Sequence, residues 1–422
     1  MILVNIIRKR IAVLALFFLF FLPVFLFGQS IRGDALTLKI AVIGPGDELY
    51  FWWGHIGLVV EDKISGTSRF FDWGVFSFEN ENFFVNFAFG RLIYTCAVSK
   101  TESNFNHFIR TNRDITLYTL DLPSDKKEAV LRFAENNMLP ENRDYAYHHF
   151  KDNCATRIRD IIDLALDGWF KAEFMNEGSR FTLRQHVRRH TWFNPFIDWI
   201  LNFWMGQDID KPITVWDDMF LPSEIAMRIK DYQYRDSYGN ERNLVSQVEI
   251  LNKSVGRPIV LDVPRKQWPR ELFVSLVFSS LLVSVYLFWR NKKFFRIFLG
   301  LAQSFLGLFF GLAGSLLFFL TFFTDHDYTY HNSNVFFVNP LFLAAIPLGL
   351  IFAFTHNEKK RFVVTRVSRA FWSYILLGGL LTMVIKLSPA FYQQNQVTQA
   401  LVLPIALTML VLMSLLGRLK KQ

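Results

Sequence analysis

The chain has 422 residues, of which 51% are hydrophobic and 17% aromatic, a composition too apolar for an ordinary soluble protein. Its net charge of +9 comes from basic clusters beside apolar segments, which leaves the rest of the chain mildly acidic. The charge pattern therefore gives no indication of nucleic-acid binding.

The first segment, residues 1–30, is predicted to direct export. Arg8, Lys9 and Arg10 precede an unbroken apolar run over residues 11–27, which ends at Gly28. A charged start, an apolar middle and a small residue at the end are typical of a secretory signal peptide. An uncleaved N-terminal anchor is the alternative. Either one predicts that the segment that follows lies outside the cytoplasm.

Residues 31–270 are predicted to form an exported α+β domain. Runs of β-branched and aromatic residues predict strands, and amphipathic runs with polar starts predict helices. The predicted strands are Leu36–Ile43, His55–Glu61, Arg69–Trp73, Arg91–Ser99 and Ile115–Leu120, and the predicted helices are Ser124–Asn137, Ala155–Leu166 and Pro195–Met205. The sequence has no CxxC or HExxH motif, and we expect neither a cofactor nor a metal.

His55 is a candidate general base. It begins a predicted strand and has glycines at positions 54 and 57, so a substrate or another backbone segment can approach it closely. An imidazole that activates a thiol needs a third group to orient its ring. Asp72, on the next predicted strand, is the first candidate for that group, and Asp152, His148 and His149 are the alternatives.

Cys154 is a candidate nucleophile. It follows Asp152 and Asn153, either of which can cap a helix, and it falls in the first turn of that helix. A thiol there meets the positive end of the helix dipole and unpaired backbone N–H groups, which favour the thiolate and can hold an oxyanion. The alternatives are an inert buried thiol and a disulfide with Cys96, the other cysteine of the chain.

Residues 271–422 are predicted to form an all-α membrane domain of five helices. Five apolar runs are long enough, or nearly so, to cross ~30 Å of hydrocarbon: Leu272–Trp289, Phe298–Phe323, Val335–Phe354, Ala370–Ile385 and Gln399–Leu416. Basic residues follow the first, third and fifth runs, whereas the loops Thr324–Asn334 and Pro389–Val397 have no Lys or Arg. The positive-inside rule therefore predicts a cytoplasmic C-terminus and an exported domain on the periplasmic side of the inner membrane.

The polar outer loop Asp325–Asn334 is a candidate binding segment. His326, His331 and Asn334 are predicted to contact a lipid head group or the catalytic domain, with a metal site or a solvated loop as the alternatives. Beside Cys154, Asn153 and Arg157 are further candidates for substrate binding. Arg157 can instead pair with a nearby carboxylate.

Gly54-His55 together with Asn153-Cys154 resembles the circularly permuted papain-like superfamily, which includes NlpC-type and lecithin:retinol acyltransferase-like enzymes. Longer segments resemble the Lnb family of bacterial lipoprotein N-acyltransferases more closely. These segments are WGHIGL, FDWGVFSF, YAYHHFKDNCATRIRD, FTLRQHVRRH, VWDDMFLPSEI and FFTDHDYTYHNSNVFFVNPL. The resemblance extends over nearly the whole chain and includes the order of exported domain and membrane domain.

This resemblance implies an acyl transfer between two membrane lipids. Cys154 would take an acyl chain from a phospholipid as a thioester, and the free α-amine of a diacylglyceryl-cysteine lipoprotein would then attack it. His55 would move the protons in both steps. From the residues alone, two other functions stay open: a membrane-tethered cysteine peptidase or amidase acting on cell-wall peptides, and a non-catalytic envelope assembly factor.

Overall fold

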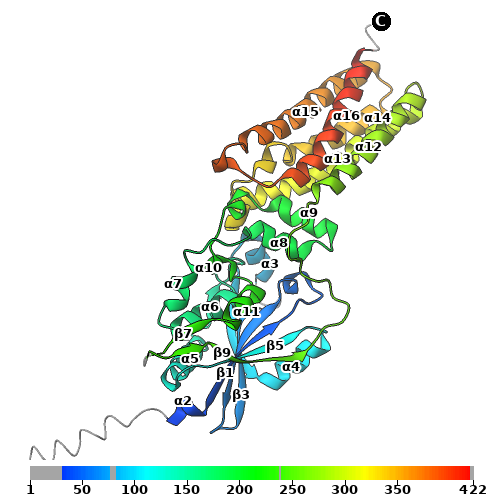
Figure 1. Ribbon diagram of the computed structural model, residues 1–422. Helices are drawn as coiled ribbons and strands as arrows, with labels where there is room; N and C mark the ends of the chain where they lie inside the picture. The colour runs from blue at the N-terminus through cyan, green and yellow to red at the C-terminus, as the bar shows by residue number, and fades with distance from the viewer. Residues whose placement is uncertain (1–30, 77–81, 237–238, 419–422) are drawn as a thin grey trace, which may run out of the picture. The chain divides into compact units, whose positions relative to one another are not determined.

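The computed structural model describes residues 31–76, 82–236 and 239–418, so the predicted signal peptide or anchor lies outside the described residues. The chain divides into two compact units (Figure 1). The first consists of Met1–Phe76, Ile93–Asn176 and Met219–Arg257, and the second of Ser77–Leu92, Glu177–Asp218 and Pro258–Gln422. Ser77–Leu92 and Glu177–Asp218 therefore group with the membrane helices rather than with the sheet.

A seven-stranded antiparallel sheet forms the centre of the first unit, with strand order β6-β4-β3-β2-β1-β5-β9. Its strands are β1 (Leu36–Ile43), β2 (His55–Asp62), β3 (Thr67–Val75), β4 (Ile93–Lys100), β5 (Ile115–Leu120), β6 (Asp144–Ala146) and β9 (Val245–Asn252). The short strands β7 (Gln233–Arg235) and β8 (Glu241–Asn243) pair separately. All five predicted strands are confirmed, and the mixed α+β class is confirmed with them.

Helices cover both faces of this sheet (Figure 1), with α4 on one face and α5, α6 and α11 on the other. The helices of this unit are α2 (Ile31–Ala35), α4 (Thr101–Arg110), α5 (Ser124–Asn137), α6 (Cys154–Ala165), α7 (Trp169–Phe174) and α11 (Pro222–Lys230). Phe105 and Phe108 of α4 pack on the buried residues Val59 and Phe70. On the other face, α6 packs against β2 and β3, the strands that carry His55 and Asp72.

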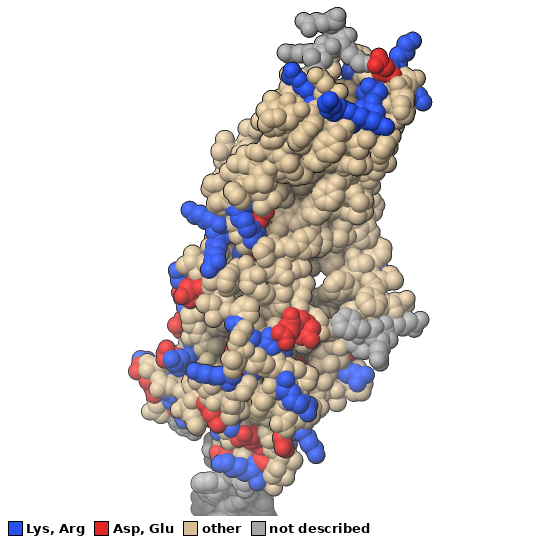
Figure 2. Space-filling view, turned by 90° about the vertical axis from the view of Figure 1, so that its right-hand side faces the viewer, with Lys and Arg blue, Asp and Glu red and all other residues tan. Residues whose placement is uncertain are grey.

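Among the described residues, five helices of the second unit are long and apolar enough to cross a membrane, which confirms the five predicted for residues 271–422. They are built from α12 (Trp268–Trp289), α13 (Lys293–Phe323), α14 (Ala345–Phe354) with the short turns before it, α15 (Glu358–Ile385) and α16 (Gln396–Arg418). Figure 2 shows basic side chains gathered at the top of the view, next to a belt with few charges. The basic α12–α13 and α14–α15 connections are exposed, as the positive-inside prediction requires.

Four helices from the region before residue 270 also belong to this second unit: α3 (Phe83–Phe89), α8 (Leu183–Thr191), α9 (Pro195–Trp204) and α10 (Val215–Asp218). The helix predicted at Pro195–Met205 is confirmed as α9. Its Trp199 and Phe203 join the buried core that the membrane helices form. The apolar face of α9 is therefore used for packing on the bundle.

The second unit also contains a buried ion pair between Arg184 and Asp210. Arg184 Nε lies 2.8 Å from Asp210 Oδ1, and the terminal nitrogens of Arg184 donate to three backbone carbonyls within residues 202–206. Asp210 also accepts the backbone N–H of Gln394 at 3.0 Å. Both side chains are almost fully inaccessible, so this pair connects the turn after α9 to the loop before α16.

Replacing Arg184 by glutamine is expected to destabilise the protein by about 3–5 kcal/mol, because it leaves the Asp210 carboxylate buried without its cation. Thermal unfolding of the full-length protein in detergent measures this loss. The control is Arg180→Gln, at an exposed arginine four residues away, for which we expect a change within about 0.5 kcal/mol. Equal melting temperatures for the two variants would contradict the structural role of the pair.

Candidate active site

Helix α6 begins with a complete capping box on Asn153. Asn153 Oδ1 accepts the N–H groups of Ala155 at 2.9 Å and Thr156 at 3.0 Å, and Thr156 Oγ1 accepts the N–H of Asn153 at 2.8 Å. The side-chain amide of Asn153 donates to two backbone carbonyls, those of His149 and Phe220. This buried network fixes Cys154 as the first residue of the helix.

The cap changes two sequence-based expectations. The N–H groups of Ala155 and Thr156 donate to the Asn153 side chain, so they are not available to an oxyanion. Of the first three backbone N–H groups of α6, the cap leaves only that of Cys154 for an oxyanion. Asn153 is 4% exposed, and its side chain holds the helix start on both its oxygen and its nitrogen. Its geometry indicates a positioning role rather than contact with substrate.

His55 and Asp72 meet on neighbouring strands. The Nε2 atom of His55 lies 2.8 Å from Asp72 Oδ1, and both side chains are mostly buried. In the β2–β3 register Asp72 lies opposite Gly57, two residues along from His55. Residues that lie opposite one another, or two positions apart, share a face of an antiparallel pair, so the Asp72 carboxylate and the His55 ring are on the same face. The Phe70 ring fills the space that the missing side chain of Gly57 leaves on this face. Of the alternatives, Asp152 accepts two hydrogen bonds from Arg157.

Gly74 lies between the nucleophile and the imidazole. A Cβ atom at position 74 would be 3.6 Å from Cys154 Cβ, 4.0 Å from His55 Cε1 and 4.0 Å from the Tyr145 hydroxyl. Gly74 has φ +118°, in the region that favours glycine, and the β3–β4 register shifts around it. The absence of a side chain here keeps open the space that Cys154, His55 and Tyr145 surround.

The electrostatic surroundings of His55 favour its protonated form. Burial alone would lower the pKa of His55, but the charges of Asp72 and Cys154 and their hydrogen bonds to the ring outweigh burial and raise the pKa to about 10. The ring therefore stays an imidazolium at neutral pH. An imidazolium beside a sulfur atom stabilises a thiolate and can later donate its proton to a leaving group.

The imidazolium is present below the raised pKa and is lost as the pH rises through about 10. We therefore expect the rate of acyl-enzyme formation to fall above that pH. Asp72→Asn is expected to move this fall to lower pH and to slow the reaction about 10⁴-fold, since the ring loses its orienting carboxylate. The control is Asp152→Asn, whose carboxylate pairs with Arg157. An upper pH limit that stays unchanged in Asp72→Asn would contradict the assigned contact.

Tyr145 was not among the site residues predicted from the sequence. It lies on the short strand β6, opposite Tyr94 of β4, and its ring is covered by the Arg157 guanidinium at 4.4 Å. Its hydroxyl is buried and has no hydrogen-bond partner among the described residues. Burial, and then the charge of Cys154, raises the pKa of Tyr145, so the phenol stays a neutral donor. A buried hydroxyl beside a nucleophile is suited to donate a hydrogen bond to a developing oxyanion.

An aromatic row lies beside the candidate nucleophile. Tyr94 stacks on Tyr147 at 4.1 Å and on Phe76 at 5.0 Å, and Phe76 meets the ring of Tyr50 at 5.4 Å. Tyr94 lies opposite Tyr145 in the β4–β6 pair, which places the row beside the strand pair that carries the Tyr145 ring. Burial, and then the charge of Cys154, raises the pKa of Tyr94 to about 12. Tyr50, at the other end, is exposed. The row gives an apolar approach to Cys154.

The two cysteines are separate free thiols, so the structure does not contain the alternative disulfide. Cys96 is 5% exposed and lies opposite Trp73 in the β3–β4 pair. Burial raises the pKa of Cys96 to about 12, which leaves it a thiol at any physiological pH. Cys154 is partly accessible, and it alone contacts an imidazole.

The other predicted binding residues have partners within their own units. Arg157 forms two hydrogen bonds with the nearby carboxylate of Asp152, at 2.6 and 2.8 Å. In the second unit His326 contacts the Phe87 carbonyl and the Tyr328 hydroxyl, His331 contacts Asp208, and Asn334 donates to the Phe203 carbonyl. Within the described residues, His326 and His331 share no metal-binding cluster. These contacts indicate that the outer loop is held in place by its own unit.

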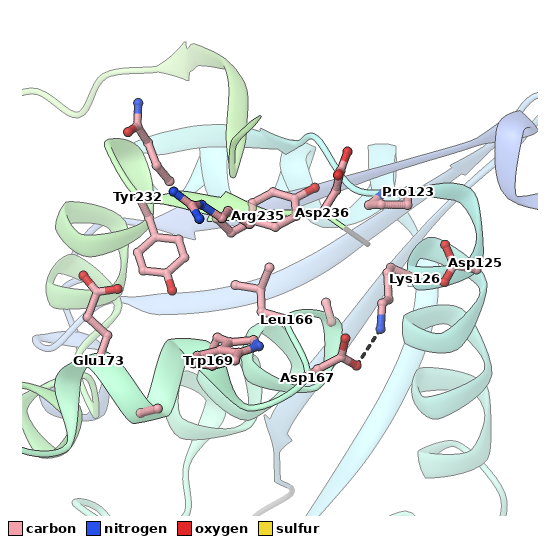
Figure 3. A pocket seen from close by; sticks show the side chains of 14 residues that line it. Pro123, Asp125, Lys126, Leu166, Asp167, Trp169, Glu173, Tyr232, Arg235 and Asp236 are labelled. Atoms are coloured by element: carbon pink, nitrogen blue, oxygen red, sulfur yellow. Dashed lines mark hydrogen bonds and ion pairs between the residues drawn. The ribbon is translucent and has the colours of Figure 1, made fainter. Parts of the chain in front are cut away.

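The first unit has a cavity elsewhere, at the carboxyl end of α6 (Figure 3). It has a volume of about 750 Å³, and Leu166, Asp167 and Trp169 line it. Lys126 and Asp167 form an ion pair across it at 2.5 Å. The two ends of a helix of this length are roughly 16 Å apart at 1.5 Å per residue. Because Cys154 begins α6, this cavity is not the space around the thiol.

Comparison with known proteins identifies both parts of the chain. Residues 27–189 match the Lnb N-terminal periplasmic domain, and residues 266–422 match the Lnb transmembrane domain. No curated protein and no solved structure matches the chain. The two matched regions together cover most of the sequence, and they contain Cys154, His55 and Asp72 as well as all five candidate membrane-spanning helices.

Proposed function

The chain belongs to the Lnb family, and we propose that it transfers an acyl chain from a phospholipid, through a thioester on Cys154, to the α-amine of a diacylglyceryl-cysteine lipoprotein. Family membership implies lipoprotein N-acylation by a multi-pass membrane protein with a periplasmic domain. The contact of His55 with both Asp72 and Cys154, at the start of α6, is the observation that supports transfer through a thioester on Cys154. The order of histidine before cysteine also supports a permuted papain-like fold.

In the first step, the Cys154 thiolate attacks the ester carbonyl of the phospholipid. A carbon–sulfur bond forms, and the carbonyl oxygen becomes negative in the tetrahedral intermediate. The ester carbon–oxygen bond then breaks, and the His55 imidazolium gives its proton to the departing alkoxide. The products of this step are an acyl thioester on Cys154 and a lysophospholipid.

In the second step, the neutral α-amine of the lipoprotein attacks the thioester, and neutral His55 accepts the proton that the amine loses. The carbon–sulfur bond breaks, so an amide forms and the thiolate returns beside an imidazolium. Water could attack the same thioester. The aromatic row of Tyr94, Tyr147, Phe76 and Tyr50 supports a lipid substrate at this point, because an acyl chain on these rings excludes water.

We infer that the Tyr145 hydroxyl donates to the oxyanion in both steps, together with the Cys154 N–H. Tyr145→Phe is expected to lower the rate of acyl-enzyme formation by about 10²–10³-fold, the effect of removing one such donor. Single-turnover measurement by mass spectrometry reads this step directly. The control is Tyr118→Phe, a half-buried tyrosine of β5. A normal rate in Tyr145→Phe would exclude the hydroxyl from the oxyanion site.

The products distinguish a transferase from a hydrolase. Full-length protein in phospholipid vesicles, supplied with a diacylated lipopeptide that has a free amine, is expected to release one lysophospholipid for each triacylated peptide formed. Release of free fatty acid with no gain of mass on the peptide would contradict the proposal and favour a hydrolase. A lipopeptide with a blocked amine is the matched control, and it should gain no acyl chain.

A further inference from the structure

The second unit contains an apolar cavity that the chemistry at Cys154 does not use. It has a volume of about 460 Å³ and lies among α9, α12, α13 and α16, within the range of about 300–1,000 Å³ that ligand sites occupy. Its walls are almost entirely apolar and include Trp199 of α9, Val274 and Phe278 of α12, and Phe305 and Phe309 of α13.

The packing of the helices explains why this cavity exists. Although α12 and α13 follow one another in the sequence, α12 packs chiefly against α16 and only lightly against α13. Trp199 of α9 stacks on Phe309 of α13 with 5.6 Å between ring centroids, so α9 closes one end of the gap. Figure 1 shows α9 beside the end of the bundle. Phe305 and Val274 line the cavity and are also exposed, so it continues to the surface of the membrane-spanning helices.

One end of the cavity is polar. Arg270 and Glu271 line it at the start of α12, and Arg270 Nε lies 2.8 Å from Glu271 Oε1. Trp199 is 4% exposed, and its indole N–H has no hydrogen-bond partner among the described residues. Buried donors are nearly always paired. This cavity therefore suits a ligand that has an aliphatic chain at one end and hydrogen-bond acceptors and charges at the other.

We propose that the cavity binds an acyl chain of the phospholipid donor, with its ester and phosphate groups at the Trp199 and Arg270 end. A guanidinium beside a carboxylate matches a zwitterionic phosphoethanolamine head, which carries one charge of each sign. The lipoprotein acceptor also has acyl chains, but its diacylglyceryl group has no phosphate, so Arg270 favours the donor. This assignment rests on the proposed function, which requires a phospholipid to supply the acyl chain.

The test uses full-length Cys154→Ala protein in phosphatidylethanolamine vesicles that contain a phosphatidylethanolamine with a photoreactive diazirine on its acyl chain. After illumination, the crosslinked peptides are mapped by mass spectrometry. We expect crosslinks concentrated on the α12 and α13 segments that line the cavity. Val274→Trp, which fills the cavity, should abolish them, whereas Leu276→Trp, on another exposed face of α12 outside the cavity lining, should not.

Competition separates the two possible lipids. Excess unlabelled phosphatidylethanolamine should remove the crosslinks, and a diacylated lipopeptide should not. Removal of the crosslinks by the lipopeptide, or crosslinks spread evenly over all lipid-facing helices, would overturn the proposal. The crosslink map of the protein that keeps Val274 decides this even if Val274→Trp does not fold. Acylation of Cys154 is measured separately in the active protein. If Cys154 is not acylated, the proposed function is refuted, but crosslinks concentrated on the cavity would still show a specific lipid site.

Discussion

Replacing Cys154 by alanine is expected to abolish acyl transfer, with a fall of about 10⁶-fold in the rate, as observed when the nucleophile of a catalytic triad is removed. Cys154 is the group that would carry the acyl chain, and no other described thiol contacts an imidazole. Formation of triacylated lipopeptide in vesicles, followed by mass spectrometry, measures the loss.

Cys96 provides the matched control, because it is the other cysteine of the chain and carries the same functional group. Its thiol is buried in β4, and burial raises its pKa to about 12. Cys96→Ala is therefore expected to keep the catalytic rate and to lose stability through the small cavity that it creates. If Cys96→Ala abolished transfer while Cys154→Ala retained it, the assignment of the nucleophile would be wrong.

The second large effect is expected at His55. His55→Gln removes the group that stabilises the thiolate and moves the proton in both steps, so we expect a loss of about 10⁵–10⁶-fold in acyl transfer. The same change should slow the alkylation of Cys154 by iodoacetamide at pH 7, because a thiol without its imidazolium partner is less ionised. Peptide mapping by mass spectrometry gives the alkylation rate of each cysteine.

His107→Gln is the control for this variant. His107 is exposed on α4, one residue before Phe108, whose ring lies 6.3 Å from the ring of His55. Its replacement should leave both acyl transfer and alkylation unchanged. Equal alkylation rates for Cys154 in His55→Gln and in the unmodified protein would show that the imidazole does not activate the thiol, and the proposed mechanism would fail.

The parts of the fold that local patterns determine were predictable from the sequence. Leu36–Ile43, Ile115–Leu120 and Ser124–Asn137 have the predicted bounds, because alternating or amphipathic burial is encoded within each segment. The membrane helices were predictable for the same reason. Strand β9 was missed because it lies at the sheet edge with most of its residues exposed, so its sequence has no alternation of buried and exposed positions to detect.

The candidate site was predictable in part. His55, Asp72 and Cys154 belong to chemical types that act together, and the structure brings these three together. Tyr145 was missed because its place beside the thiol depends on the pairing of β6 with β4, which no local pattern specifies. The same limit applies to Asn153: its position predicted a cap, but its hydrogen bond to the distant Phe220 carbonyl depends on tertiary structure.

The most direct test of the proposed function is the mass of the intact protein after exposure to phospholipid vesicles. We expect an added mass equal to one acyl chain on Cys154, sensitive to hydroxylamine as a thioester is. Addition of the diacylated lipopeptide should then remove this mass from the protein and place it on the peptide amine. A protein that acylates the peptide without ever carrying the chain on Cys154, or that gains no acyl chain at all, would contradict the account.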